Sequence, residues 1–270
     1  MKITFLGTGP SGRIPRPNCG KWYVCKEARK PGSKSARMQS SAFLEFENQN
    51  ILIDASQDIK KQLKLVERKK IDAVFLTHGH IDAAGGLKQL YELRKKSGLP
   101  AIHTEKNTKN VLIKNALWAD FPFTEIRPLQ KITFPPKADQ PWADNNFSVT
   151  PFGVEHAFNP KFLTLGFLFE NEKRVVYASD FKIMPSESKR LIKNADLAIL
   201  DCAAYNKPIP THQSLPEILE LVKEMNFKKV YLTQVGIAWP HYELAQKIVS
   251  KQAKNIFLAY DGLEIKPFNC

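Results

Sequence analysis

One short segment, Thr77 to Asp82, constrains this chain more than any other, because it places two histidines and a carboxylate just past an apolar strand. It follows the run Ala73 to Leu76 directly, and His78, His80 and Asp82 are each two residues apart. Alternate side chains of an extended segment point the same way. The spacing therefore predicts two imidazoles and a carboxylate that face one point, as a metal site requires. A single histidine at a strand end would be an ordinary loop residue, but that interpretation does not explain all three.

This segment resembles the signature loop of the metallo-β-lactamase superfamily, in which Thr-His-x-His-x-Asp follows a hydrophobic strand. In that superfamily the next residue is a histidine that binds a second metal, and here the position holds Ala83. The resemblance implies an α/β protein with the αββα four-layer sandwich of the metallo-β-lactamase fold. It also implies ligands at later strand ends. His156 and Asp180 stand in the matching positions, and Gln234 stands where the last histidine is expected.

The donor set implied by this resemblance is complete for one metal and incomplete for a second. Three imidazole nitrogens and one carboxylate with an open position are the pattern of a catalytic zinc site. Because Ala83 and Gln234 replace two histidines, we expect one tightly bound metal and a second that binds weakly or not at all. Zinc is the expected ion, with manganese or iron as alternatives. The predicted metal-site residues are His78, His80, Asp82, His156, Asp180 and Gln234, whereas His103 and His241 are interpreted as structural and surface residues.

Several further stretches resemble PhnP-type phosphodiesterases, in order, along nearly the whole chain. In that family an N-terminal loop holds a structural zinc through three cysteines and one histidine. Here only Cys19 and Cys25 remain in the loop, and Ile237 stands about where the histidine would be. Two thiolates do not close a tetrahedral site, so we predict that this zinc is absent. The matching stretches are 12–19, 25–29, 40–41, 52–55, 177–180, 201–202, 211–212 and 260–265.

PhnP-type enzymes resemble RNase Z and cleave cyclic phosphodiesters of ribose, and this implies roles for three residues. His212 is near the position of a histidine that assists the leaving group, and Asp201 is near that of an acidic residue that orients it. His212 also fits a simpler interpretation as a loop residue before a helix. A metal in the site would lower the pKa of a water molecule, and Asp82 could accept a hydrogen bond from that water and act as its base. The predicted activity is hydrolysis of a small anionic phosphodiester, cyclic or nucleotide-like.

The net charge of +13 leaves alternatives open. A basic surface attracts nucleic acid, which favours an RNase Z-like nuclease, although no separate insertion suited to gripping tRNA is visible. A lysine-rich surface without any partner explains the charge equally well. The altered positions Ala83 and Gln234 and the depleted cysteine loop favour a third interpretation, a degenerate, non-catalytic metal- or ligand-binding accessory protein. Bound metal would support the enzyme, and salt-sensitive RNA binding would support the nuclease.

Length and composition predict one domain over residues 1–270, because 43 % apolar residues suffice for a core and no linker or repeat divides the chain. No apolar run approaches the roughly 20 residues that span a bilayer, and residues 1–7 read as a strand and not as a signal peptide. We therefore expect a cytoplasmic protein without membrane contact, with its cysteines reduced.

The apolar pattern predicts β–helix–β units in both halves of the chain and a β-hairpin over residues 41–54. A long polar loop, residues 12–39, carries both early cysteines, and loops of this length in a compact domain are usually functional. A helix is predicted over residues 107–118, whereas the proline-rich segment 121–145 is predicted to be a loop.

Overall fold

Most strands carry apolar side chains on both faces, so each sheet needs a covering layer on both sides. In β3 (Asn50–Ile53), Ile51 and Ile53 belong to the core between the two sheets, whereas Leu52 packs with the helices outside. The same two-residue alternation occurs in β10 (Arg174–Ala178). The period of two thus sorts the side chains into an inner core and two outer ones.

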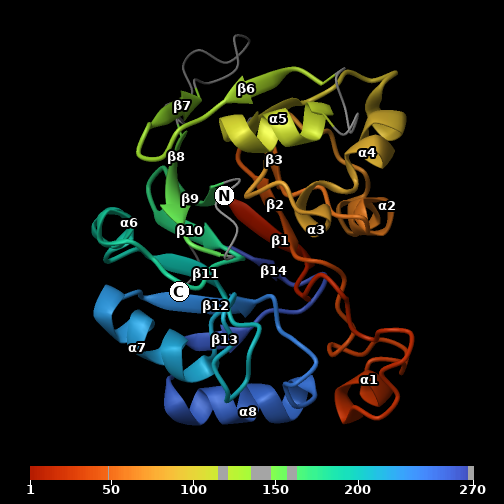
Figure 1. Ribbon diagram of the computed structural model, residues 1–270, viewed down its shortest axis with the longest axis vertical. Helices are drawn as coiled ribbons and strands as arrows, with labels where there is room; N and C mark the ends of the chain where they lie inside the picture. Colours follow the sequence, from red (N-terminus) through yellow and green to blue (C-terminus); the bar gives the residue numbers. More distant parts are fainter. Residues whose placement is uncertain (48, 115–120, 135–146, 157–162, 267–270) are drawn as a thin grey trace.

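The computed structural model describes all residues except 48, 115–120, 135–146, 157–162 and 267–270. In this part of the chain two seven-stranded sheets pack face to face between two helical layers, which is the predicted αββα sandwich (Figure 1). The first sheet has the order β14 (Glu264–Ile265), β1 (Lys2–Gly7), β2 (Ser41–Glu45), β3, β4 (Ala73–Phe75), β5 (Ala101–Thr104) and β6 (Phe123–Glu125). The second has the order β13 (Ile256–Leu258), β12 (Lys229–Thr233), β11 (Leu197–Asp201), β10, β9 (Thr164–Glu170), β8 (Phe147–Val154) and β7 (Ile132–Phe134).

The helices divide between the two outer faces (Figure 1). Within the described residues no helix is both long enough and apolar enough to cross a membrane. The first sheet is covered by α2 (Ile59–Gln62), the 3-10 turn η1 (Leu63–Val66), α3 (Ile81–Ala84), α4 (Leu87–Arg94) and α5 (Lys106–Lys114). The second is covered by α6 (Ser186–Ile192), α7 (Leu215–Met225) and α8 (Tyr242–Gln252).

The helix predicted over 107–118 is present as α5 over its described residues, and residues 115–118 lie outside the described part. Two local predictions differ from the structure. The predicted loop 121–145 contains the edge strands β6 and β7, which pair with β5 and β8. Such short strands are defined by backbone pairing with a neighbour, which a hydrophobic pattern does not reveal. The long loop 12–39 likewise contains a short helix, α1 (Tyr23–Glu27).

The prediction of reduced cysteines is wrong for the early pair, because Cys19 and Cys25 form a disulfide bond. The Trp22 amide donates a hydrogen bond to the Cys19 carbonyl at 3.0 Å, and this turn leads into α1 and brings the two Cα atoms to 6.0 Å. Ile237 packs against the small apolar cluster around the disulfide. An apolar contact therefore occupies the place where the resemblance led us to look for a zinc-binding histidine. Cys202 is a buried thiol just after β11, and Cys270 lies outside the described residues.

Removing both early cysteines should leave the metal content of the protein unchanged. In a Cys19→Ser/Cys25→Ser variant no zinc ligand is lost, because the two sulfur atoms bind each other and Ile237 offers no donor. Elemental analysis of the variant beside the unmodified protein checks this, and the loss of one zinc per chain would contradict it.

Candidate metal centre

The strand directions bring the predicted ligands to one edge of the sandwich. β3 and β4 run parallel in the first sheet, and β10, β11 and β12 run parallel in the second. β8 and β10 are both antiparallel to β9, so β8 has the direction of β10. Side chains that follow these strands therefore meet at one end, as in other open α/β sheets. The backbone N–H of Leu165 donates to the carbonyl of Thr77 at 2.8 Å and ties the two sheets together there.

The structure brings the three predicted histidines together. One ring nitrogen from each of His78, His80 and His156 forms a cluster in which all the atoms lie within 4.8 Å of one another. The ring centroids are separated by 4.6 Å for His78–His80, 5.4 Å for His78–His156 and 5.6 Å for His80–His156. A second group at the same spacing consists of His156, Asp180 and His212.

The loop geometry around His80 differs from the extended segment on which the sequence argument was based. His80 caps the N-terminus of α3, so Asp82 lies in the first turn of a helix and not on a continued strand. The backbone N–H of Ala55 donates to the carbonyl of Ala83, and that of Gly86 donates to the carbonyl of Ala55, both at 2.7 Å. These bonds fasten the helix carrying Asp82 to the loop after β3.

Burial lowers the pKa of two of these imidazoles and so favours the neutral form, which is the form that binds metals. Complete burial lowers the pKa of His78 to about 3, and burial followed by the charge of His156 lowers the pKa of His80. The Nδ1 atom of His156 lies 3.0 Å from the carbonyl oxygen of Thr211 and donates to it, which leaves Nε2 as the ligand atom. Such a carbonyl partner fixes the tautomer and the orientation of a metal-binding histidine.

A chain of hydrogen bonds behind His78 likewise fixes the orientation of that ring. These hydrogen bonds were not predicted from the sequence. The hydroxyl of Thr77 lies 2.8 Å from Nδ1 of His78 and 2.9 Å from Oδ2 of Asp54, so it can accept from the ring and donate to the carboxylate. The Thr77 amide also donates to Asp54 at 2.8 Å. Burial raises the pKa of Asp54 well above its usual range. The sequence feature that could have predicted this contact is the position of Asp54, directly after the apolar strand β3.

Replacing Thr77 with valine should weaken metal binding by about 10- to 100-fold, the usual effect of removing a partner behind a metal ligand. Valine keeps the shape of threonine, and the substitution removes the hydroxyl between His78 and Asp54. Competition with a chelator of known affinity measures the change. A matched control is Thr4→Val, a buried threonine on β1. Equal affinities for Thr77→Val and the unmodified protein would contradict this role.

Two carboxylates stand beside the histidines. Burial alone would raise the pKa of Asp180, but the imidazoles of His78 and His156 lower it to about 2. Burial and then the negative charge of Asp180 raise the pKa of Asp82 to about 6. Asp82 lies on the cavity wall next to the two donor groups without belonging to either. A cation between the two carboxylates would relieve their repulsion.

Gln234 lies at its predicted position, but it uses its side-chain amide in a way that opposes a second metal. The amide nitrogen donates to Oδ1 of Asp180, and the amide oxygen accepts from the Ser40 hydroxyl at 2.9 Å. The N–H group therefore faces the carboxylate that would have to bridge two cations. Gln234 has a positive φ of 61°, which turns the chain immediately after β12.

The protein is accordingly expected to hold one tight metal per chain. Ala83 offers no donor atom, and Gln234 presents an N–H group to Asp180. Elemental analysis after dialysis should give about one equivalent of transition metal. A Gln234→His variant restores an imidazole beside Asp180 and should raise this number toward two. Two tight equivalents in the unmodified protein would contradict the assignment.

His212 is paired with the end of β11. Its Nδ1 lies 2.7 Å from Oδ2 of Asp201, which is fully buried and also accepts from the amides of Phe181 and Ala203 at 3.0 and 2.9 Å. Burial alone would lower the pKa of His212, but the charge of Asp201 outweighs it and raises the pKa to about 9. The imidazole is therefore protonated at neutral pH. Its ring centroid lies 4.7 Å from that of His156.

The two remaining histidines lie apart from these groups. His103 on β5 stacks on Phe75 with ring centroids 4.6 Å apart, and burial lowers its pKa to about 4. His241 precedes α8 and its Nδ1 lies 2.9 Å from Glu243. Both placements agree with the structural and surface roles that the sequence indicated.

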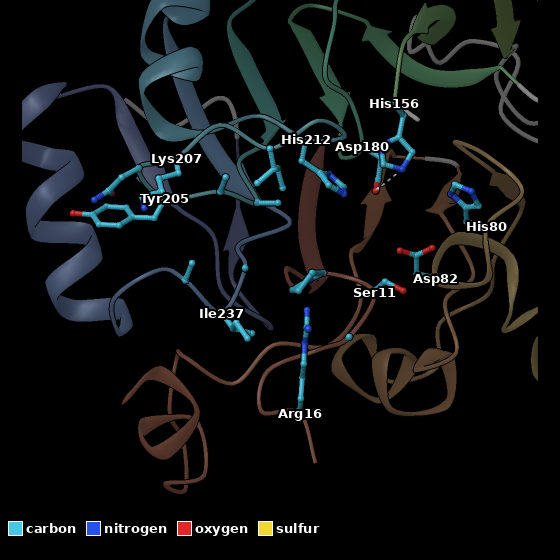
Figure 2. Close-up of a pocket in the computed structure, with 18 of the residues that line it drawn as sticks. Ser11, Arg16, His80, Asp82, His156, Asp180, Tyr205, Lys207, His212 and Ile237 are labelled. Carbon is cyan, nitrogen blue, oxygen red and sulfur yellow. Dashed lines mark ion pairs between the residues drawn. The ribbon is translucent and has the colours of Figure 1, made fainter. Parts of the chain in front are cut away.

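A cavity of about 750 Å³ is lined by His80 and His156 of the candidate metal centre, and its size is typical of small-molecule sites. Figure 2 shows Asp82, His156, Asp180 and His212 directed into it, and Arg16 reaching in from the opposite side. Its remaining walls are largely apolar and come from three segments that are distant in sequence. These are residues 10–12 before the cysteine loop, 203–209 after β11, and 236–238 after β12.

Comparison with known proteins agrees with this geometry. A family profile described as "Beta-lactamase superfamily domain" matches residues 49–233. An octanoyltransferase of Porphyromonas gingivalis is 24 % identical over 269 residues, which are 98 % of this chain and 51 % of that protein, so the chain spans about half the length of this relative.

Two solved structures share the fold. A diphosphatase of the PhnP family superposes with a TM-score of 0.82 at 23 % identity and covers 98 % of this chain and 97 % of its own. Zinc-bound PqqB from Methylobacterium extorquens gives a TM-score of 0.81 at 20 % identity, with 98 % of this chain and 100 % of its own covered. With the profile spanning most of the chain and the histidine segment in place, this protein belongs to the β-lactamase superfamily and has the metallo-β-lactamase fold.

Proposed function

We propose that this protein is a metal-dependent hydrolase that cleaves small phosphodiesters. The observation that carries the proposal is the position of His212: a protonated imidazole, held by Asp201, lies beside the donor cluster at the inner end of one open cavity. A metal site alone would suit many reactions. A cationic acid next to it suits a reaction in which an alkoxide leaves.

The donor set fits one transition-metal ion. His78, His80 and His156 each supply a ring nitrogen, and Asp180 supplies an ionised oxygen. Thr77 orients the ring of His78, and the carbonyl of Thr211 orients that of His156. Nitrogen-rich sets with one carboxylate suit zinc, and manganese or iron(II) are the alternatives. When bound, such an ion lowers the pKa of a water molecule and withdraws electron density from a phosphoryl oxygen.

The residues of the chain then divide the remaining tasks. Asp82 faces the cavity without belonging to the donor cluster, so its carboxylate can accept a hydrogen bond from the attacking water and orient it. His212 uses Nδ1 to contact Asp201, which leaves Nε2 to donate a proton to the departing oxygen. Asp201 is fixed by two backbone amides and positions the ring. Water and acid are thus supplied by different sides of the cavity.

The proposal is tested by reloading metal-free protein with one equivalent of zinc, manganese or iron(II). The reloaded protein should hydrolyse bis(4-nitrophenyl) phosphate and 2′,3′-cyclic AMP. An ester, 4-nitrophenyl octanoate, belongs in the same assay because the cavity walls are apolar and one relative is named an octanoyltransferase. Hydrolysis of the ester alone would replace the proposal with an acyl-ester hydrolase. Stoichiometric metal without hydrolysis of any substrate would favour a non-catalytic binding protein.

The charge of +13 favours one second candidate, an RNase Z-like nuclease. A nuclease neutralises several phosphates, so its affinity for RNA should fall steeply with salt. Measuring binding of a 20-nucleotide RNA between 50 and 200 mM salt distinguishes the two. A loss of about 10³-fold or more over this range would support the nuclease, whereas weak and salt-insensitive binding would support the small-molecule enzyme.

A further inference from the structure

Arg16 is a cation that the proposed reaction does not use. It lies in the long loop 12–39 and lines the cavity from the wall opposite the histidines. Figure 2 shows its side chain extending toward the space between His212 and Asp82. Within the described residues no carboxylate forms an ion pair with it. An arginine directed into a concave, partly apolar site without a carboxylate partner is a binding group for an anion.

The loop is built to hold Arg16 in this place. The backbone N–H of Arg16 donates to Sγ of Cys19 at 3.0 Å, within the disulfide to Cys25. Arg29 donates to the Arg16 carbonyl at 3.2 Å and to the Cys25 carbonyl at 2.8 Å. The guanidinium itself lies against Gly12, where an added Cβ would stand 2.4 Å from Nε. A larger residue at position 12 would therefore move the guanidinium away from its present place.

The positions of the charges indicate which anion Arg16 would meet. The carboxylates that line the cavity, Asp82 and Asp180, both lie at the metal end, where the scissile phosphate would be held in the proposed function. Arg16 enters from the other side, beside the apolar Ile237. The cavity of about 750 Å³ has room for more than one phosphate group.

We propose that Arg16 binds a second, non-scissile phosphate of the substrate, so that the disulfide-closed loop selects phosphodiesters carrying an additional phosphate. This inference rests on the proposed phosphodiesterase activity. The guanidinium can donate two parallel hydrogen bonds to phosphate oxygens, and the planar pairing gives geometric selectivity. Because this phosphate does not react, its contact contributes to binding and leaves the chemical step unchanged.

A pair of esters that differ by one phosphate tests the inference. Thymidine 5′-(4-nitrophenyl phosphate) carries only the scissile group, and its 3′-phosphorylated form carries a second. Arg16→Met should lower kcat/KM for the 3′-phosphorylated ester by about 10- to 100-fold, through KM, as expected for a lost charged hydrogen bond. The ester without the 3′-phosphate should be affected less than threefold. Equal losses on both esters, or a loss in kcat alone, would assign Arg16 to the scissile phosphate and overturn the inference.

Three further variants test whether the position of the Arg16 guanidinium matters, or only the presence of a positive charge nearby. Lys26→Gln removes one positive charge from an exposed site of the same loop and should leave both esters unaffected. Gly12→Ala displaces the guanidinium without removing it and should reproduce part of the Arg16→Met effect. Lys207→Met removes the charge of a lysine that also lines the cavity. A selective loss in Lys207→Met and none in Arg16→Met would overturn the assignment.

Binding to the metal-free protein keeps this inference separate from the proposed activity. Calorimetry should show tighter binding of thymidine 3′,5′-bisphosphate than of thymidine 5′-phosphate, and Arg16→Met should remove that difference. If neither ester is hydrolysed but the difference in binding follows Arg16, the proposed activity fails and the anion site stands. If the two nucleotides bind equally to the unmodified protein, the anion site fails whatever the activity.

Discussion

Replacing His78 with alanine is expected to remove the bound metal and to lower phosphodiester hydrolysis by on the order of 10³-fold or more, because the ion would supply several kcal/mol of charge stabilisation in the transition state. His78 is completely buried, and its ring is oriented by Thr77 and Asp54. The loss should appear first in elemental analysis and then in the assay. Added zinc should restore little activity, because the donor itself is missing.

A buried histidine also contributes to packing, so this variant needs a control for folding. His241→Ala makes the same chemical change outside the donor groups and should keep both metal and activity. Circular dichroism should show that both variants are folded. A folded His78→Ala protein that keeps its metal would contradict the proposed site.

The second large effect concerns His212, whose replacement with alanine should slow hydrolysis by about 10²–10⁴-fold while the metal content stays unchanged. The loss should be large for 2′,3′-cyclic AMP, where an alkoxide leaves and needs a proton. It should be small for bis(4-nitrophenyl) phosphate, because nitrophenolate leaves without one. Equal losses on the two substrates would assign His212 to binding or to structure.

The pH dependence gives an independent check on His212. Asp201 raises the pKa of His212 to about 9 in the metal-free protein, so the acid form of this ring is lost on the alkaline side of neutrality. A bound cation moves this loss toward lower pH, because like charges repel. Activity toward 2′,3′-cyclic AMP should therefore fall on the alkaline side. Asp201→Asn removes the raising charge, and this limb should move toward lower pH, in the direction of the ordinary histidine value near 6.5. An unmoved limb would show that another group controls it.

The same pKa has a consequence for stability. Since the folded-state pKa of His212 lies above the ordinary value, protonation of this ring favours the folded metal-free protein. That contribution is fully present below pH 6.5 and is lost as the pH rises through about 9. Replacing Asp201 should reduce this contribution to stability, because the charge that raises the pKa of His212 is then missing.

Local patterns determined the parts of this protein that depend on residues close together in the chain. The apolar pattern predicted β–helix–β units in both halves of the chain, and helices cover the outer face of each sheet. The run from Thr77 to Asp82 indicated a metal site at a strand end, and the donor cluster lies there. Pairs that are adjacent in sequence, such as a strand and the polar residue after it, carry this information directly.

These local patterns could not predict the edge strands or the loop conformations. β6 and β7 exist because their backbones pair with β5 and β8, and nothing in their own residues requires it. The Cys19–Cys25 bond depends on the turn at Trp22 and on the apolar cover of Ile237, more than 200 residues further along the chain. Composition had indicated reduced thiols, because it contains no information on which sulfur atoms meet.

The sequence by itself thus indicated the fold family and the histidines that cluster at the strand ends, and it predicts a weak second metal site, because each inference follows from residue type at a strand end. Only the tertiary structure decided how those residues are used. Asp54 reaches His78 through Thr77, Gln234 turns its N–H group to Asp180, and Arg16 faces the metal side across the cavity. These contacts join side chains from separate strands and loops. The packing of the two sheets brings these side chains together, and no local sequence pattern contains that information.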